Sequence, residues 1–284
     1  VASIMIPLLY GQNGANLGWS VTAIIMGVIG GLCMLPVGFV AKERFDGEKD
    51  EEASFGDLFH ALLQNKNLFA IITVRFLFLL TYTMQVLNPI FSEYVMGNET
   101  VGSLLALLIS VPTIILAVVL PMLCRRFDKT HMLVFFMALY AVTSIVQYFV
   151  GYSSMVMFLL FTTIRSVGYG GFTSLAFMFI PDCIEYGQYT TGQRNAGTSF
   201  CLQTFVSKLN SAIISSLTAF IIAAMGFSAT NVTAQGKDGV WFTYTIFAAV
   251  GSIIAIPILL KFYKLRDKDV ANMIACNNGE ITKE

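Results

Sequence analysis

Residues 101–123 read VGSLLALLISVPTIILAVVLPML, an apolar stretch without a charged side chain. A helix needs about 20 such residues to cross the hydrocarbon core of a bilayer, so this stretch can span one. The chain carries seven runs of this kind, at about 18–41, 69–92, 101–123, 131–151, 154–180, 199–225 and 239–263. We therefore expect an all-α polytopic membrane protein, with lipid as its natural solvent.

The composition supports this class. Of 284 residues, 56% are apolar and 12% charged, and the mean hydropathy is +0.73. Globular domains carry about 25% charged residues. This excludes a soluble enzyme, a disordered chain and a nucleic-acid-binding protein. The five cysteines show no CxxC pair and no metal-ligand spacing, so we expect no disulfide framework, metal site or cofactor.

The basic residues indicate sidedness. Between the predicted spans, 13 Lys and Arg fall on one side, Lys237 falls on the other, and Arg75, Arg165 and Lys208 lie inside spans. Because Lys and Arg favour cytoplasmic loops, we expect the 42–68 loop and the C-terminus to be cytoplasmic and the protein to lie in the cell membrane.

The 42–68 segment divides the chain. Ser54 to Asp57 fits a capping box, and a helical apolar stripe follows at Phe55, Leu58, Phe59, Leu62 and Leu63. This pattern predicts a short helix that lies on the membrane surface or packs on other cytoplasmic loops. Residues 1–10 are apolar but too short to span; we expect them to be the end of another span, since no basic region marks a signal peptide.

Prolines and glycines indicate bent helices. Pro36, Pro112 and Pro257 lie inside predicted spans, where proline removes a backbone hydrogen bond and kinks the helix. Gly168, Gly170 and Gly171 surround Tyr169. Such glycines serve either mobile helices or close helix packing, and both interpretations stay open.

Lys208 is the clearest candidate for a functional charge. Nine residues after its span begins near Ser199, it should lie roughly 14 Å deep, near the midplane. Thr204, Ser211 and Ser215 share its helix face, with Gln203 and Ser207 beside them. Interhelical hydrogen bonding explains the hydroxyls but not the lysine, because a charge at this depth is costly unless it is functional. No acidic residue lies mid-span to pair with it, so its counter-ion must come from outside the chain or from a substrate.

Two arginines also fall within spans. Arg165 lies midway along 154–180 and serves either a site or a structural bond to backbone carbonyls, because arginine stays charged and needs a partner. Arg75 is nearer the cytoplasmic end of its span, and we expect it to snorkel to the interface.

Two polar stretches join spans at the cytoplasmic side. Residues 125–129, RRFDK, form a compact basic turn, and 181–197 read PDCIEYGQYTTGQRNAG between two spans. We expect both to act as a cytoplasmic gate whose charge-assisted bonds break as helices move. The gate candidates are Asp182, Glu185, Tyr186, Gly187, Gly192, Arg194, Gly197, Arg125, Arg126 and Asp128.

The second stretch and the helix after it resemble the glycoside–pentoside–hexuronide:cation symporters, the melibiose-permease-like group of the major facilitator superfamily. That group has paired acidic residues, a Tyr-Gly pair and a Gly-x-Arg in this loop, then a lysine in the next helix. The matching positions are Asp182, Glu185, Tyr186, Gly187, Gln188, Tyr189, Gly192, Arg194, Gly197, Thr204, Phe205 and Lys208.

The resemblance implies a domain layout. Residues 1–41 would be a remnant of the N-terminal bundle, namely the end of helix five (1–10) and helix six (18–41). Residues 42–68 would be the linker, 69–263 the C-terminal six-helix bundle and 264–284 a cytoplasmic tail. The first four helices, which hold the cation-binding carboxylates in the family, would then be missing.

The resemblance also implies a function: cation-coupled (Na⁺ or H⁺) transport of a sugar, glycoside or hexuronide by a monomer, through alternating access. Lys208 and Thr204 match the cation-site region. Where the family offers an aromatic residue to the sugar, this chain has Thr173, with Tyr169 and Phe172 as candidate replacements. The candidate substrate cavity comprises Gln203, Ser207, Ser211, Arg165, Tyr169, Phe172 and Thr173.

Three other functions remain as alternatives: a carrier of lipid or another solute, a transport-inactive sensor on the same fold, and a membrane-embedded enzyme. Membrane enzymes place His, Asp or Glu within spans, and this chain has none there, so the enzyme is disfavoured. Neither the sugar nor the coupling ion follows from these residues.

Cysteine labelling tests the predicted sidedness. Single cysteines at Lys49 and Lys268 should react with an impermeant maleimide in opened cells and stay unlabelled in intact ones, because the basic loops face the cytoplasm. A cysteine that replaces Lys237 should already react in intact cells, because that residue is predicted to lie outside. Labelling of the cysteine at position 49 or 268 from outside intact cells would contradict the topology.

Overall fold

The computed structural model describes residues 15–40, 56, 65–192 and 196–278, and within these residues every regular element is a helix. The predicted loop helix after Ser54 lies outside the described residues except for Gly56, and so do residues 1–10 and Arg194. The last residues of the predicted 42–68 linker belong to the next helix, which begins at Lys66. Within the described residues, seven helices are long and apolar enough to cross a membrane, which agrees with the predicted fold class and number of spans.

The first span is α2 (Ala15–Val40), which contains Pro36 as the sequence predicted. Its mean hydropathy of 2.1 over Ser20–Phe39 is that of a membrane helix. The compact unit that contains α2 is separate from the unit that holds the other described helices.

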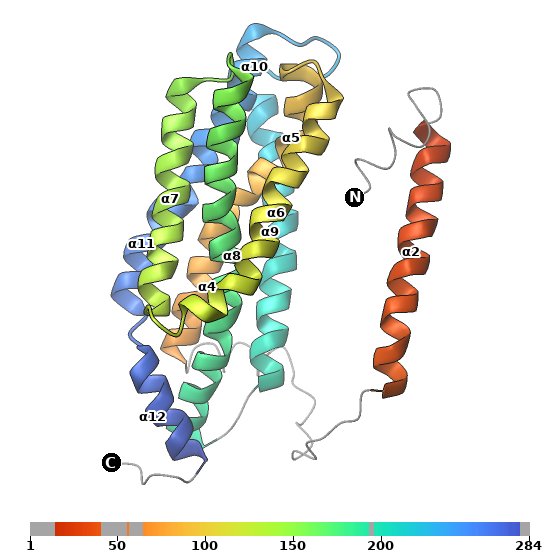
Figure 1. The fold of residues 1–284 in the computed structure, drawn as a ribbon. Coiled ribbons are helices and arrows are strands. Elements are labelled where there is room, and N and C mark those ends of the chain that lie inside the picture. Colours follow the sequence, from red (N-terminus) through yellow and green to blue (C-terminus); the bar gives the residue numbers. More distant parts are fainter. Residues whose placement is uncertain (1–14, 41–55, 57–64, 193–195, 279–284) are drawn as a thin grey trace. The chain divides into compact units, whose positions relative to one another are not determined.

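The second unit is a bundle of six spans followed by a short helix (Figure 1). Its first and last spans are interrupted helices, and the other four are continuous. The elements in order are α4 (Lys66–Phe78), η2 (Leu79–Tyr82), α5 (Thr83–Ile90), η3 (Phe91–Val95), α6 (Glu99–Leu123), α7 (Lys129–Val150), α8 (Met155–Thr191), α9 (Ala196–Ala224), α10 (Ala234–Phe242), η4 (Thr243–Phe247), α11 (Ala248–Phe262) and α12 (Asp267–Asn277).

The interruptions follow from local sequence and packing. In the first span, η2 is a 3₁₀ turn and η3 a π-turn two residues after Pro89. The last span carries the π-turn η4. Such turns leave backbone carbonyls open to other donors, a feature common at functional positions. Pro112 and Pro257 lie inside α6 and α11, as predicted.

Helix α8 is the centre of the bundle and packs along α6 and α7. Its glycines allow this close approach. A Cβ on Gly168 would lie 2.8 Å from the backbone nitrogen of Tyr140, and one on Gly170 would lie 2.8 Å from Cα of Thr113. The structure therefore supports close packing, the second of the two interpretations of these glycines.

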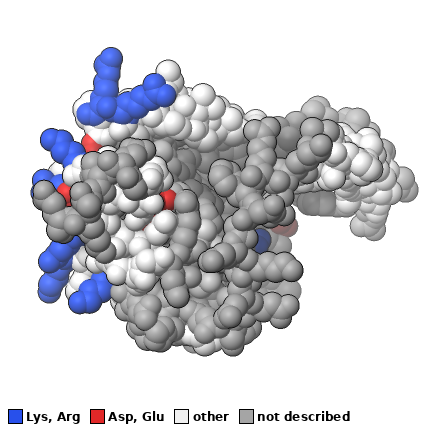
Figure 2. Space-filling model, turned by 90° about the horizontal axis from the view of Figure 1, so that it is seen from below, with Lys and Arg blue, Asp and Glu red and all other residues white. Residues whose placement is uncertain are grey.

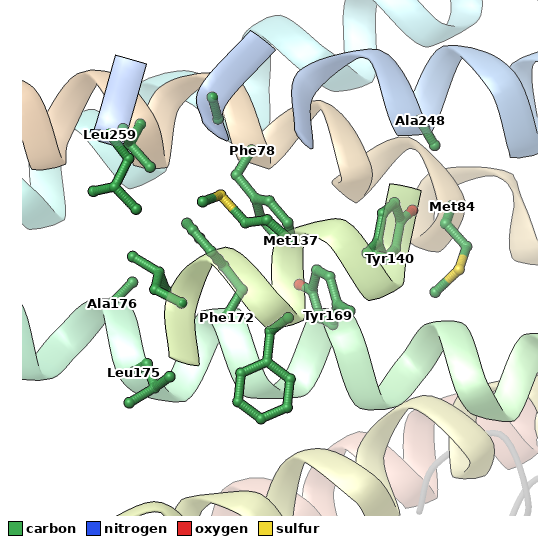
Figure 3. Close-up of a cluster of buried hydrophobic side chains, with 14 of the residues drawn as sticks. Phe78, Met84, Met137, Tyr140, Tyr169, Phe172, Leu175, Ala176, Ala248 and Leu259 are labelled. Atoms are coloured by element: carbon green, nitrogen blue, oxygen red, sulfur yellow. The ribbon is translucent and has the colours of Figure 1, made fainter. Parts of the chain in front are cut away.

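Apolar side chains from four spans fill the space beside this contact (Figure 3). Phe78, Tyr140 and Phe172 lie together there, with the Phe78 and Phe172 rings stacked at 3.6 Å between centroids. All three side chains are buried.

The C-terminal part of α8 corrects the sequence prediction. The span was expected to end at residue 180, before a connecting stretch, but the helix continues through Pro181 to Thr191. It ends at Gly192, whose φ of 75° suits a glycine cap and whose N–H donates to the Gln188 carbonyl at 2.8 Å. Proline removes one helical hydrogen bond only, and contacts with α12 and Lys129 hold the polar extension in place.

Basic side chains gather at one end of the bundle. There α4, α7 and α9 begin and α6, α8 and α11 end, and α12 follows; we call this the basic end. Figure 2 looks onto it and shows Lys and Arg side chains along its rim. The loop residues 124–128 and 263–266 both belong to this end, which agrees with the alternation of sides predicted from the charges.

Substituting Gly168 tests the close packing. Gly168→Ala should lower the free energy of unfolding by about 1–3 kcal/mol, because the new methyl group meets the backbone of α7 and forces the two helices apart. Thermal unfolding of the purified protein in detergent measures this.

The matched control is Gly187→Ala on the same helix. Its Cβ would meet the amide end of the Asn65 side chain at 3.4 Å, a contact that can adjust. Alanine favours a helix over glycine by about 1 kcal/mol, so the control should not be destabilised. Equal stability of the two variants would contradict the packing argument.

Candidate functional site

The hydroxyl face of α9 bonds mainly to its own helix. Each hydroxyl donates to a carbonyl four residues earlier, at 2.8–2.9 Å, in Thr204, Ser207, Ser211 and Ser215. This satisfies the hydroxyl protons locally, as is usual for serine and threonine in helices. The oxygens can still accept a bond from elsewhere.

Lys208 lies in the middle of α9, 12 residues after Ala196 in a 29-residue helix, which is roughly 18 Å along it. Its side chain is exposed in the bundle. Across the described part of the chain, no hydrogen bond or ion pair involves its ammonium. Gln203 lies five residues earlier but is buried, and its side-chain oxygen has no partner within the described residues.

Arg165 lies inside the bundle with no exposed surface. Its Nη1 donates to the Tyr244 carbonyl in η4 at 3.1 Å, and its guanidinium carbon lies 4.5 Å from the centroid of the Tyr244 ring. Tyr140 of α7 approaches it at 5.8 Å. The bond to a backbone carbonyl and the contact with aromatic rings agree with the structural alternative. Nε and Nη2 of the same guanidinium are buried and have no partner among the described residues.

Two of the three candidates for sugar contact lie in the bundle interior. Tyr169 and Phe172 are buried beside Phe78. Thr173 is half-buried and lines an open groove of about 450 Å³ between α6 and α8. The groove's other lining residues are Thr113, Ala117, Leu120, Pro121, Ser174, Phe177 and Met178.

Phe177 is an aromatic side chain at this groove that sequence reasoning did not select. It is exposed to 55% and lies 4.6 Å, ring centroid to guanidinium carbon, from Arg75. It follows Thr173 by four residues, which places both on one face of α8. That spacing was the signal that could have identified it.

Arg75 corrects a second prediction. It was expected to reach the interface, but its side chain is only 7% exposed. Its Nη2 donates to the Ser207 hydroxyl of α9 at 3.4 Å, and Phe177 covers the guanidinium. Packing against α8 and α9 thus keeps the charge inside the bundle. Its position near the end of the span had predicted that the side chain reaches water.

A charged cluster joins three helices at the basic end. Lys129 Nζ, at the start of α7, lies 2.5 Å from an Asp182 carboxylate oxygen and 3.3 Å from one of Asp267. Asp182 belongs to α8 and Asp267 to α12. We call these three residues the Lys129 cluster. Asp182 was predicted here, but its partners were not, because a contact between distant segments leaves no local pattern.

The other gate candidates fall around this cluster. Asp128 caps α7 by accepting bonds from the Thr130 and His131 amides at 2.9 and 3.2 Å. Glu185 accepts a bond from the Asn277 amide of α12 at 3.0 Å. The remaining described candidates are Tyr186 (half-buried), Gly187 (facing Asn65), Gly192 (capping α8), Gly197 (exposed at the start of α9) and Arg125 and Arg126 (both exposed).

These features together define a polytopic helical membrane protein that carries positive charges within its spans. The chain belongs to the MFS/sugar transport protein family, whose model matches residues 1–267. This confirms the family predicted from the 182–208 motif. It also places the chain with transporters rather than with membrane-embedded enzymes.

Curated relatives agree with this assignment. The chain is 27% identical to an uncharacterized symporter, YnaJ, of Bacillus subtilis (strain 168), over 96% of this chain and 61% of the relative. It is 25% identical to a putative sulfoquinovose importer of Escherichia coli (strain K12), over 98% and 60%. It is 26% identical to an isoprimeverose transporter of Lactiplantibacillus pentosus, over 97% and 58%. The chain therefore spans about 60% of the length of these relatives.

Removing the lysine of the Lys129 cluster tests its structural role. Lys129→Met leaves the buried Asp182 carboxylate without its cation and releases Asp267. We expect a loss of about 1–3 kcal/mol of stability. Faster hydrogen exchange in Asp267–Asn277 should accompany it, because α12 loses an anchor. Thermal unfolding and exchange mass spectrometry measure the two effects.

The control is Lys268→Met, the same substitution at an exposed lysine beside Asp267. It should change stability by less than about 0.5 kcal/mol. Unchanged exchange of α12 in Lys129→Met would show that the cluster does not hold this helix.

Proposed function

We propose that this chain is part of a cation-coupled secondary active transporter that moves a sugar or glycoside by alternating access. Residues 69–263 would be its C-terminal six-helix bundle and residues 1–41 would belong to the other bundle. Family membership supports this proposal, as do relatives named as a symporter and as carriers of two different sugars.

The observation that carries the proposal is the placement of Lys208. A charge near the middle of a span costs several kcal/mol if it faces lipid, so such residues face a polar cavity or a partner. Lys208 is exposed, and among the described residues it has no acidic partner. The face of α9 that carries it therefore suits the wall of a polar cavity.

Transporters of this kind bind substrate and coupling ion near the bilayer midplane, between two helix bundles. We infer that carboxylates from the other bundle approach Lys208, and that Na⁺ or H⁺ competes with its ammonium for them. Thr204 lies one turn earlier on the same face and would supply a hydroxyl oxygen. Cation occupancy would then be linked to the relative position of the bundles.

The basic end would act as the cytoplasmic gate, and the protein would lie in the cell membrane as a monomer. In the Lys129 cluster, charge-assisted bonds join the ends of α7, α8 and α12. Such bonds can break and re-form as bundles rock, because each is strong only in one geometry. The side chains of Arg125 and Arg126 are exposed there and make no bond within the described residues, so they can contact the opposing bundle.

Substituting Lys208 in the complete transporter tests the coupling. Lys208→Ala should abolish uphill accumulation of sugar in vesicles with an imposed Na⁺ or H⁺ gradient, while downhill exchange persists. Lys208→Arg should restore it incompletely, because a planar guanidinium differs from a compact ammonium.

Lys237→Ala, a lysine at the other end of the bundle, serves as the control and should transport normally. Undiminished accumulation by Lys208→Ala, with the same cation dependence, would show that the lysine is structural. Absence of gradient-driven accumulation in the unaltered protein, for every sugar tried, would favour the sensor or the non-sugar carrier.

A further inference from the structure

Arg75 is a buried charge within the first span of the bundle. It lies nine residues after the start of α4 at Lys66, which is roughly 14 Å along the helix. Its side chain is 93% buried, between α8 and α9. An arginine does not lose its proton in a protein, so the positive charge persists there and requires compensation.

The described residues compensate this charge only in part. Nη2 donates to the Ser207 hydroxyl at the long distance of 3.4 Å. Nη1 is buried and has no hydrogen-bond partner among the described residues. No described Asp or Glu forms an ion pair with the guanidinium. One donor of the guanidinium fork is therefore available to an anion.

An unused acceptor lies on α9, one turn before Ser207. Gln203 is 3% exposed, and its side-chain oxygen has no partner in the described structure. Ser207 lies between the two residues, since its hydroxyl donates to the backbone carbonyl of Gln203 at 2.8 Å and accepts from Arg75. An unpaired donor on α4 and an unpaired acceptor on α9, on the two sides of Ser207, suit a ligand that carries both an oxyanion and a hydroxyl group.

A single aromatic ring separates Arg75 from the groove. Phe177 covers the guanidinium at 4.6 Å from its ring centroid, and it also lines the groove of about 450 Å³ between α6 and α8. Because this side chain is 55% exposed, it can change rotamer without displacing the core. Thr113 and Thr173 also line this groove, and the hydroxyl of each donates to a carbonyl of its own helix.

We propose that Arg75 is the anchor of an anion-binding site that recognises a carboxylate or sulfonate substituent of the transported sugar. The proposal rests on sugar transport, as proposed above, and narrows its substrate to acidic sugars. Nη1 and Nη2 bind the oxyanion, Gln203 accepts a bond from a sugar hydroxyl, and Phe177 moves aside to admit the ligand. A planar guanidinium matches the geometry of an oxyanion better than any other side chain does.

Paired probes that differ in one group test this in the complete transporter. Methyl glucoside and methyl glucuronide share a ring and differ at C6, where the second has a carboxylate; methyl galactoside and methyl galacturonide form a second pair. Equilibrium binding to the purified protein needs no ion gradient, so it does not depend on coupling. In at least one pair the acid should bind at least about tenfold more tightly, as expected of a charge-assisted bond. The corresponding methyl sulfoquinovoside distinguishes a sulfonate from a carboxylate preference.

Variants then assign the preference to Arg75. Arg75→Gln should remove at least about tenfold of affinity for the acid and leave the neutral sugar unchanged. Arg75→Lys should retain part of the preference, because it keeps the charge but not the fork. Ser207→Ala preserves the charge and should weaken binding of the acidic sugar by a smaller factor. This variant provides a test even if Arg75→Gln does not fold. Lys237→Gln removes a distant cation and should change neither affinity.

Three results overturn the anion site. The first is that the wild-type protein binds neither acid more tightly than its neutral counterpart, a result that would leave neutral sugar transport intact. The second is that Arg75→Gln weakens both members of a pair equally, as expected if the arginine pairs with a carboxylate of the opposing bundle. The third is an acid preference that survives in both Arg75→Gln and Ser207→Ala.

Discussion

The cost of placing a charge in a bilayer governs this structure, because Arg75, Arg165 and Lys208 lie deep inside spans and none of them forms an ion pair with a described acidic residue. Each cation is accommodated differently. Arg165 donates to a carbonyl that the π-turn η4 exposes and lies against two tyrosines. Arg75 has one long bond and one unused donor. Lys208 has no partner among the described residues. Arg165 also keeps two buried donors, Nε and Nη2, without a partner among the described residues. Arg75 differs from it in lying next to a groove, and Lys208 differs in being exposed, which makes these two the candidates for binding and coupling.

Close packing at α8 makes these placements possible. Gly168 and Gly170 let α7 and α6 approach the helix to backbone contact. The same packing fixes Phe172 and Tyr169 in the core and leaves Phe177, on the other face of α8, at the groove. Closely spaced residues of α8 can therefore face the core on one side of the helix and the groove on the other.

Polar contacts at the basic end connect segments that are distant in sequence. Lys129 joins α8 and α12, and Asn277 of α12 reaches Glu185. Asn65 donates to the Cys183 carbonyl at 2.7 Å, which fixes the start of α4 against α8. These bonds lie where helices enter and leave the bundle, so a relative movement of the spans must strain or break them. This location suits the proposed gate better than a substrate site.

The sequence by itself determined the class of the protein, its spans and its family, because each follows from local patterns: apolar length and the motif at 182–208. It located Lys208 and Arg165 as unusual charges for the same reason. Tertiary structure decided what each charge contacts. Arg75 was predicted to reach water, but α8 and α9 enclose it. Helix α8 continues through Pro181 because α12 and Lys129 support its polar end. Contacts between distant segments depend on how helices pack, and helix packing depends on many side chains at once rather than on any local pattern.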